Sequence, residues 1–330
     1  MGCQGGELRE KLFDICAANL STLEPKTKGI FRCPMCLEDF DRSALEVDQK
    51  LTIGHIIPEA VGGKIFTLEC GKCNHNIGGT YDSHVDKMKT LIDWVLRREG
   101  AKKLIHLKGG ESDTAAYLAW EKGPMAVIKA TNWNDPNYQI YSKRLGSQFK
   151  QGNFKFTITA ETHLNCEWTI LSAIHSAFLM MFYCFGYEYI LSPEADIIRK
   201  IIHERKAPWE ISKMSVYVPI TLVDNHEIPS AGVLTKPKKM KSFVVILPCF
   251  STEEYFQMIL LPGFQSERTF HNFINRKKRT AGEIDITFTT IKDVPCSKGI
   301  CKARWEGKFL GRNTEADSAF AKAKELGYKG

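Results

Sequence analysis

The chain has 330 residues, of which 43% are hydrophobic and 25% are charged, a balance typical of globular proteins. This composition excludes a largely disordered chain, and the length predicts two domains, residues 1–99 and 100–330. Residues 1–99 hold 13 Lys and Arg against 15 Asp and Glu, whereas the remainder holds 32 against 23. Because neutralised phosphates drive sequence-independent nucleic-acid binding, the second part is expected to supply most of any such affinity.

The first 99 residues predict two helical regions with a hairpin between them. Apolar residues at helical spacing predict a helix over residues 7–20. Two runs, Leu51–Ile57 and Lys64–Cys70, flank a turn at Gly62-Gly63 and predict a β-hairpin. A helix is expected from Cys73, interrupted at Gly78-Gly79 and resuming from Tyr81 to Arg98.

Beyond residue 100 the pattern becomes a mixture of strands and helices. Strands are expected at Met125–Lys129, Tyr138–Tyr141, Phe154–Ala160, Ser215–Leu222, Phe243–Leu247, Ile284–Thr290 and Arg304–Leu310. Helices are expected at 167–185, 193–205 and Thr314–Leu326, and Glu254–Leu261 fits either structure. The predicted class is therefore α+β, with a small N-terminal domain followed by a larger mixed domain of unpredicted topology.

One apolar segment raises the question of a membrane. Thr169–Tyr187 contains no Asp, Glu, Lys or Arg and is nearly long enough to span a bilayer. It has no basic anchors at its ends and it contains His175, so a buried core helix is the favoured interpretation. The N-terminus has no apolar stretch before a cleavage site, so we expect a cytoplasmic protein with no membrane association.

Four of the eleven cysteines form two C-x2-C pairs. Each pair presents two thiolates from one tight turn, and two pairs complete a tetrahedral structural zinc site. In a chain with no export signal, this spacing favours metal binding over disulfides. The pattern predicts a structural zinc ion bound by Cys33, Cys36, Cys70 and Cys73, the alternative being unpaired thiols.

The residues between and just after these pairs narrow the chemistry. Three short motifs follow one another along this segment: Gly54-His55-Ile56-Ile57-Pro58, the Gly62-Gly63 turn and Cys70-Gly71-Lys72-Cys73-Asn74. This pattern resembles the HNH (ββα-metal) endonuclease family over residues 33–84. The resemblance implies a zinc-stapled nuclease that hydrolyses phosphodiester bonds, most often in DNA. By analogy it also suggests a role in bacterial phage or mobile-element defence.

The resemblance assigns roles to two side chains, and their chemistry agrees. His55 takes the place of the general base, and an imidazole accepts a proton near neutral pH. Asn74 takes the place of a ligand for Mg²⁺ or Mn²⁺, and an amide carbonyl is a hard oxygen donor. Alternatively, the histidine is structural and the asparagine caps a helix.

Two positions depart from the family pattern. The residue before the catalytic histidine is usually Asp, Glu or His and binds the catalytic metal, but here it is Gly54. Ile65 replaces the central Asn of the family name. Replacement metal ligands can be sought among Glu59, Asn76, Asp82 and His84. Of these, Asp82 is favoured, the alternative being that it caps the helix that follows.

The loss at Gly54 has two consequences. If metal binding survives, Gly54→Asp should strengthen it by restoring the usual carboxylate. If it does not, the chain is a catalytically decayed zinc module that docks nucleic acid or a protein partner.

Two basic runs, Lys236–Lys241 and Arg276–Arg279, fit either phosphate contacts or solvated loops. The expected partner is nucleic acid, with DNA favoured, and a protein partner or homo-oligomer is possible.

Overall fold

The computed structural model describes residues 2–107, 114–121, 126–132, 134–150, 163–204, 215–219, 229–236, 242–249, 255–262 and 287–290. They form helices and antiparallel sheets, which confirms the predicted α+β class. The chain divides into two compact units, one made of Met1–Val85 with Cys166–Gly330 and the other of Asp86–Asn165. This division differs from the boundary predicted at residue 99, because the helices after residue 165 pack on the N-terminal segment.

The first unit begins with a helix and a short two-stranded sheet. Helix α1 (Gly2–Leu23) is longer than the helix predicted over 7–20. Strands β1 (Phe31–Arg32) and β2 (Asp39–Phe40) pair on either side of the first cysteine pair. The Arg9 guanidinium donates to the Leu45 carbonyl at 2.8 Å, which ties α1 to the chain that precedes the hairpin.

The predicted hairpin is present as β3 (Leu51–His55) and β4 (Phe66–Cys70). Both strands are shorter than predicted, since Pro58 and the 3-10 turn Glu59–Val61 take the chain out of the ladder. Helix α2 (Gly71–Ile77), the π-helical turn η4 (Gly78–Asp82) and helix α3 (Ser83–Val95) then follow without a break. The predicted interruption at Gly78-Gly79 is thus a widened helical turn, a feature that is frequent at functional sites.

Three consecutive helices follow residue 165: α5 (Cys166–Phe185), α6 (Tyr187–Ile190) and α7 (Pro193–Glu204). Among the described residues, α5 is the helix long and apolar enough to cross a membrane, and 83% of its most apolar window is buried inside the protein. The predicted core helix is confirmed, because fifteen of its residues are buried.

The strands after α7 form one antiparallel sheet in the order β12-β9-β10-β11-β8. Their bounds are β8 (Ser215–Pro219), β9 (Ser230–Lys236), β10 (Ser242–Pro248), β11 (Tyr255–Pro262) and β12 (Thr287–Thr290). The strands predicted from residues 215, 243 and 284 are confirmed over the residues that the structure describes, and the described part of the ambiguous segment 254–261 is a strand. Strand β9 is absent from the sequence predictions. The predictions for Phe154–Ala160, Arg304–Leu310 and Thr314–Leu326 lie outside the described residues, as do both basic runs apart from Lys236.

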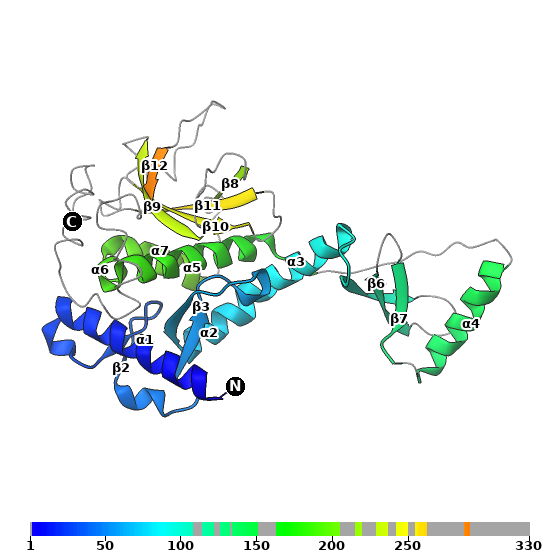
Figure 1. Cartoon of the computed structure of the whole chain (residues 1–330), viewed down its shortest axis with the longest axis horizontal. Coiled ribbons are helices and arrows are strands. Elements are labelled where there is room, and N and C mark those ends of the chain that lie inside the picture. Colours follow the sequence, from blue (N-terminus) through cyan, green and yellow to red (C-terminus); the bar gives the residue numbers. More distant parts are fainter. Residues whose placement is uncertain are drawn as a thin grey trace. The chain divides into compact units, whose positions relative to one another are not determined.

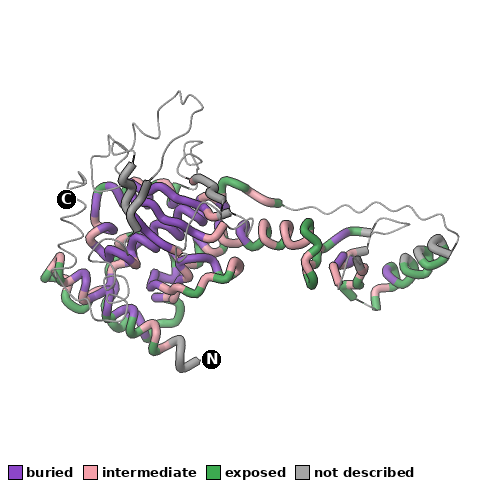
Figure 2. Tube along the Cα trace, turned by 45° about the horizontal axis from the view of Figure 1, so that its top comes forward, coloured by how far each residue is buried: buried purple, intermediate pink, exposed green. Residues whose placement is uncertain are grey.

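The first unit is layered. Figure 1 shows α5, α6 and α7 between the five-stranded sheet and the N-terminal elements. One continuous core includes side chains of α1, the hairpin, these helices and the central strands, and Figure 2 shows it in purple. The N-terminal segment therefore shares its core with residues far along the chain.

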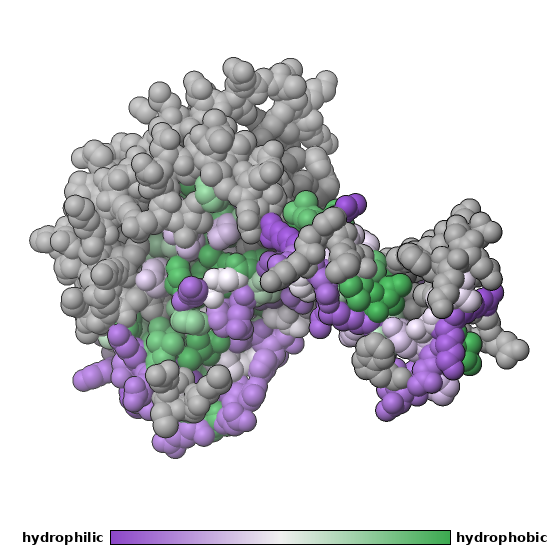
Figure 3. All heavy atoms as spheres, turned by 45° about the vertical axis from the view of Figure 1, so that its right-hand side comes forward, coloured by the Kyte–Doolittle hydropathy of each residue, from purple (hydrophilic) through white to green (hydrophobic). Residues whose placement is uncertain are grey.

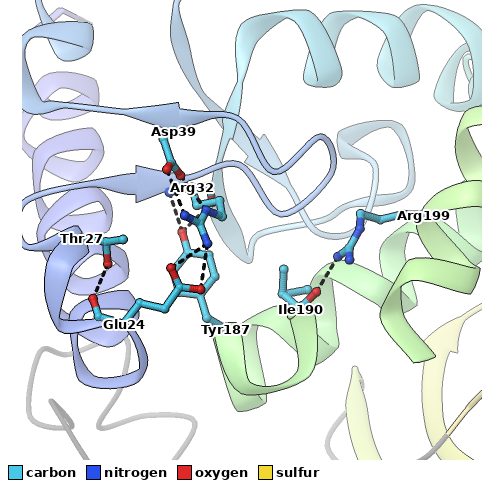
Figure 4. A network of polar contacts seen from close by, with 7 residues as sticks. All are labelled: Glu24, Thr27, Arg32, Asp39, Tyr187, Ile190 and Arg199. Atoms are coloured by element: carbon cyan, nitrogen blue, oxygen red, sulfur yellow. Dashed lines mark hydrogen bonds and ion pairs between the residues drawn. The ribbon is translucent and has the colours of Figure 1, made fainter. Parts of the chain in front are cut away.

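Polar contacts add to this shared core, as Figure 4 shows. The Tyr187 hydroxyl accepts from the Arg32 backbone N–H at 3.0 Å and donates to the Arg32 carbonyl at 2.5 Å. The Arg32 guanidinium pairs with Glu24 at 3.0 Å and Asp39 at 2.6 Å. On α7, Arg199 donates to the Ile190 carbonyl at 2.6 Å. The contacts of Arg32 hold the segment that carries the first cysteine pair, and the Arg199 contact joins α7 to α6.

The second unit contains the antiparallel meander β5 (Lys102–Leu107), β6 (Thr114–Trp120) and β7 (Ala126–Ala130), followed by helix α4 (Pro136–Lys150). Its small core consists of Ile105, Ala116, Leu118 and Tyr138. Green apolar side chains show beside purple hydrophilic ones on its surface in Figure 3. The exposed ones that the structure describes here are Val95, Leu96, Leu104 and Ile140.

The strand predicted at Tyr138–Tyr141 is wrong, because these residues belong to α4. Their aromatic and β-branched side chains favour a strand. However, Pro136 opens the helix, and the Asp135 carboxylate accepts from the Asn137 N–H at 2.9 Å. This helix-start signal outweighs the strand preference of the residues that follow.

Candidate active site

The four paired cysteines come together at one point. Their sulfur atoms all lie within 4.8 Å of one another, and Cys36 Sγ is 3.7 Å from Cys70 Sγ. That separation is far longer than a disulfide, about 2.05 Å. It matches the edge of a tetrahedron with Zn–S bonds of about 2.3 Å, roughly 3.8 Å. The cluster therefore has the donors and spacing that zinc requires.

The local chain geometry supports thiolates at this cluster. The Cys70 backbone N–H points at Cys33 Sγ at 3.5 Å, and the Cys73 N–H at Cys70 Sγ at 3.4 Å. Hydrogen bonds from the neighbouring thiols hold the pKa of Cys36 far below its ordinary value, whereas burial raises the pKa of Cys33. At Gly71, an added Cβ would lie 1.8 Å from the Gln49 carbonyl oxygen, so glycine allows the second pair to approach the segment just before the hairpin.

The hairpin carries a polar face. Gly54 is opposite Thr67, and Thr52 is opposite Glu69, so alternation places these four residues on one face. Thr67 and Glu69 have no exposed surface. A buried polar face on a small sheet is unusual, because unpaired polar groups are costly to bury.

Helix α2 presents Asn74 to this face. Its Nδ2 donates to Thr52 Oγ1 at 3.0 Å and to the Ile53 carbonyl at 3.5 Å. A backbone carbonyl only accepts, so the amino group must lie on this side of the amide. The Asn74 carbonyl oxygen is thereby turned toward Gly54, 3.5 Å from the position that a Cβ there would occupy.

Glu69 fills the space that a side chain at residue 54 would need. A Cβ on Gly54 would lie 2.3 Å from Glu69 Oε1. The prediction that Gly54→Asp strengthens metal binding therefore carries a steric condition, since the new side chain would have to displace the Glu69 carboxylate.

Helix α5 closes the site from the other side. His175 Nε2 lies 3.4 Å from Glu69 Oε2, and Ser172 Oγ donates to Asp82 Oδ1 at 2.6 Å. Burial raises the pKa of Asp82 above its ordinary value, although His175 and the Ser172 hydrogen bond oppose the rise. Burial alone lowers the pKa of His175, but the carboxylates of Glu69 and Asp82 outweigh it and raise that pKa.

His55 is the last residue of β3 and is half-buried. Its ring meets the ring of Phe66 edge-on, with the centroids 4.8 Å apart. Its charge also acts on the Asp82 carboxyl, in the direction that lowers the pKa of that group. His55 and Asp82 thus share one electrostatic environment.

The other metal ligands considered from the sequence lie apart from this polar face. Ser83 N–H bonds to the Gly78 carbonyl, so no helix begins there and Asp82 does not cap one. Glu59 is exposed, and His84 packs edge-on against Trp168 with the centroids 4.8 Å apart. Asn76 lines a hollow of about 210 Å³ beside Cys36, on the side of the cysteine cluster.

Residues 33–90 match the family model described as HNH endonuclease. These residues form an HNH endonuclease domain. The matched segment contains all four cysteines together with His55, Asn74 and Asp82. No curated protein and no solved structure matches the chain. At the level of the family, this match supports nuclease activity and implies nucleic acid as the substrate.

Two residues near the HNH site are absent from the sequence predictions. Glu69 is an acidic residue in an otherwise apolar or uncharged strand, and His175 is a histidine in the middle of an apolar helix. Each of these residues can be noticed in the sequence. The contact between them cannot be predicted from the sequence, because α5 lies outside the matched segment.

Proposed function

We propose that the protein is a metal-dependent endonuclease that hydrolyses phosphodiester bonds in DNA, with Mg²⁺ or Mn²⁺ as the catalytic ion. The observation that carries this proposal is the orientation of Asn74. Two hydrogen bonds from its amino group orient the carbonyl oxygen so that it points into a buried acidic site within the HNH domain. An oxygen donor held in advance in this way suits a hard divalent cation.

In this proposal the roles are divided between ion and protein. A bound divalent ion supplies stabilisation of the negative charge that develops on the phosphate and the leaving oxygen. Asn74 holds the ion, and Asp82 adds negative charge beside it. His55 accepts the proton of the attacking water on a ring nitrogen, which is feasible near neutral pH because an imidazole is largely neutral there.

The rival function is a decayed module that docks nucleic acid or a protein, and Gly54 is the observation that favours it. The buried Glu69 carboxylate supports the active form instead. Burying a carboxylate without donors is costly, so a site that no longer binds an ion has no reason to keep it. Residues outside the HNH domain then select the substrate, and a role in defence against phage or mobile elements stays part of this proposal.

The proposal is tested by incubating the zinc-loaded full chain with supercoiled plasmid, linear DNA and single-stranded RNA. Each substrate is tried with Mg²⁺, with Mn²⁺ and with neither ion, while zinc content is monitored. Nicking or linearisation that needs the added ion supports the proposal. Tight binding to DNA without cleavage under any condition assigns the docking function, and cleavage that needs no added ion contradicts the mechanism.

A further inference from the structure

The starting observation is a buried carboxylate without a well-formed hydrogen bond. Glu69 has no exposed surface, its Oε2 pairs with His175 Nε2 at 3.4 Å, and among the described residues neither of its oxygens accepts a hydrogen bond of good geometry. The imidazole of His175 faces it, and its Nε2 is likewise buried without a hydrogen bond. Groups of this kind are rare in folded proteins and call for a missing partner.

The position of Glu69 Oε1 indicates what that partner is. This oxygen lies beside the Cα of Gly54 on the same face as the Asn74 carbonyl. HNH relatives place a metal-binding side chain at residue 54, so here a carboxylate from the opposite strand enters the same space. The side chain that Gly54 lacks on β3 is thus replaced by the Glu69 carboxylate on β4.

The partner must be a cation that binds both a carboxylate oxygen and an imidazole nitrogen as ligands. The 3.4 Å between Glu69 Oε2 and His175 Nε2 is longer than a hydrogen bond usually is. It is compatible with two ligands of one ion, which are separated by roughly 3 Å when the bonds are about 2.1 Å. Asp82 is less suited, because Ser172 already occupies one of its oxygens.

We propose that Glu69 of β4 and His175 of α5, together with the Asn74 carbonyl, bind the divalent cation of the nuclease site, in place of the side chain that Gly54 lacks. The identity of the ion as catalytic rests on the proposed function, whereas its binding does not. Because an imidazole ligand suits transition ions better than Mg²⁺, the site should prefer Mn²⁺ to Mg²⁺. A helix outside the HNH match thus completes the site.

The first test measures Mn²⁺ binding to the zinc-loaded full chain, by the loss of the free Mn²⁺ signal in electron paramagnetic resonance. Glu69→Gln and His175→Gln should each weaken binding more than about tenfold, a loss that even outer partners of a metal can cause. Glu59→Gln, on the same hairpin, and His163→Gln, just before α5, are the matched controls, since both residues are exposed. Unchanged binding in either ligand variant overturns the proposal.

The second test uses thermal unfolding. Without Mn²⁺, Glu69→Gln should melt no lower than the wild type, because it removes a buried carboxylate whose oxygens accept no hydrogen bond of good geometry among the described residues. With Mn²⁺, the wild type should gain stability and the variant should not. A variant that melts lower without Mn²⁺ would show a structural ion pair between Glu69 and His175 instead, and would overturn the proposal.

The third test moves the carboxylate back to the other strand. Gly54→Asp alone should destabilise the protein, because its Cβ meets Glu69 Oε1. Glu69→Ala alone should lose Mn²⁺ binding, and the double variant Gly54→Asp/Glu69→Ala should recover it. A folded double variant that binds no Mn²⁺ contradicts the proposal.

These readouts separate the two proposals. A protein that binds Mn²⁺ through Glu69 but cleaves no nucleic acid leaves the site assigned and removes the nuclease function. A protein that cleaves DNA with Mn²⁺ while Glu69→Gln binds and cleaves as the wild type leaves the function and removes this site.

Discussion

The hydroxyl of Tyr187, on α6, forms hydrogen bonds with both the N–H and the carbonyl of Arg32. A helix far along the chain thus satisfies both backbone groups of one residue of β1. The hydroxyl is buried beside the N-terminal segment that carries Cys33 and Cys36. Through this contact and the shared core, the cysteine cluster depends on residues outside the HNH domain. The HNH domain is therefore expected to need α5–α7 in order to fold.

Tyr187→Phe should destabilise the whole protein by about 1–3 kcal/mol, because it leaves two backbone groups of Arg32 without a partner. Urea unfolding of the zinc-loaded chain measures the change. Tyr117→Phe is the control, since that ring lies in the second unit and its contact with Lys102 needs only the ring. Equal stabilities of Tyr187→Phe and the wild type would show that the contact is dispensable.

Cys70→Ser should abolish zinc binding, because it removes one of four ligands and the N–H···S contact from Cys73. Elemental analysis of protein purified without added metal should give about one zinc ion per wild-type chain and almost none in the variant. The hairpin should unfold with it, since the cluster joins β4 to the first cysteine pair. The exposed Cys166→Ser is the control. A zinc-free protein with an unchanged melting temperature contradicts the structural role.

The sequence was sufficient where the signals are local. The cysteine spacing predicts the cluster, and the Gly62-Gly63 turn predicts the hairpin. It was insufficient where the outcome depends on pairing over long distances. The polar face of the hairpin becomes visible only when Glu69 is placed next to Gly54 and opposite His175.

The domain boundary illustrates the same limit. A chain that contains a zinc-stapled motif invites the prediction of an independent N-terminal domain. The apolar surface of the motif is instead buried against α5 and its neighbours. No local pattern records which element covers a given apolar face.

The uneven charge predicts where nucleic acid is gripped. Replacing Arg276, Lys277, Lys278 and Arg279 by Gln should weaken DNA binding and lower its salt dependence, by up to about 0.9 in log–log slope for each phosphate that the variant no longer neutralises. The prediction is made in the full chain, because the two sequence halves are not separate units. Lys26→Gln/Lys28→Gln, two exposed lysines of the acidic N-terminal part, is the control. An unchanged slope in the fourfold variant, or an equal drop in the control, would contradict this placement.

His55→Ala should lower the cleavage rate by roughly two to four orders of magnitude, because it removes the group that accepts the proton of the attacking water. Asn74→Ala should do nearly the same for a different reason, since it removes an oxygen that two hydrogen bonds orient toward the proposed ion. The two variants are distinguished by Mn²⁺ binding, which Asn74→Ala should weaken and His55→Ala should leave close to that of the wild type. Neither should change the zinc content, because both side chains lie outside the cysteine cluster.

His75→Ala is the matched control, since His75 follows Asn74 directly on α2 and its side chain is exposed. Cleavage at the wild-type rate by His55→Ala would remove this residue from the mechanism, and an equal loss in His75→Ala would mean that the effect comes from disturbing α2.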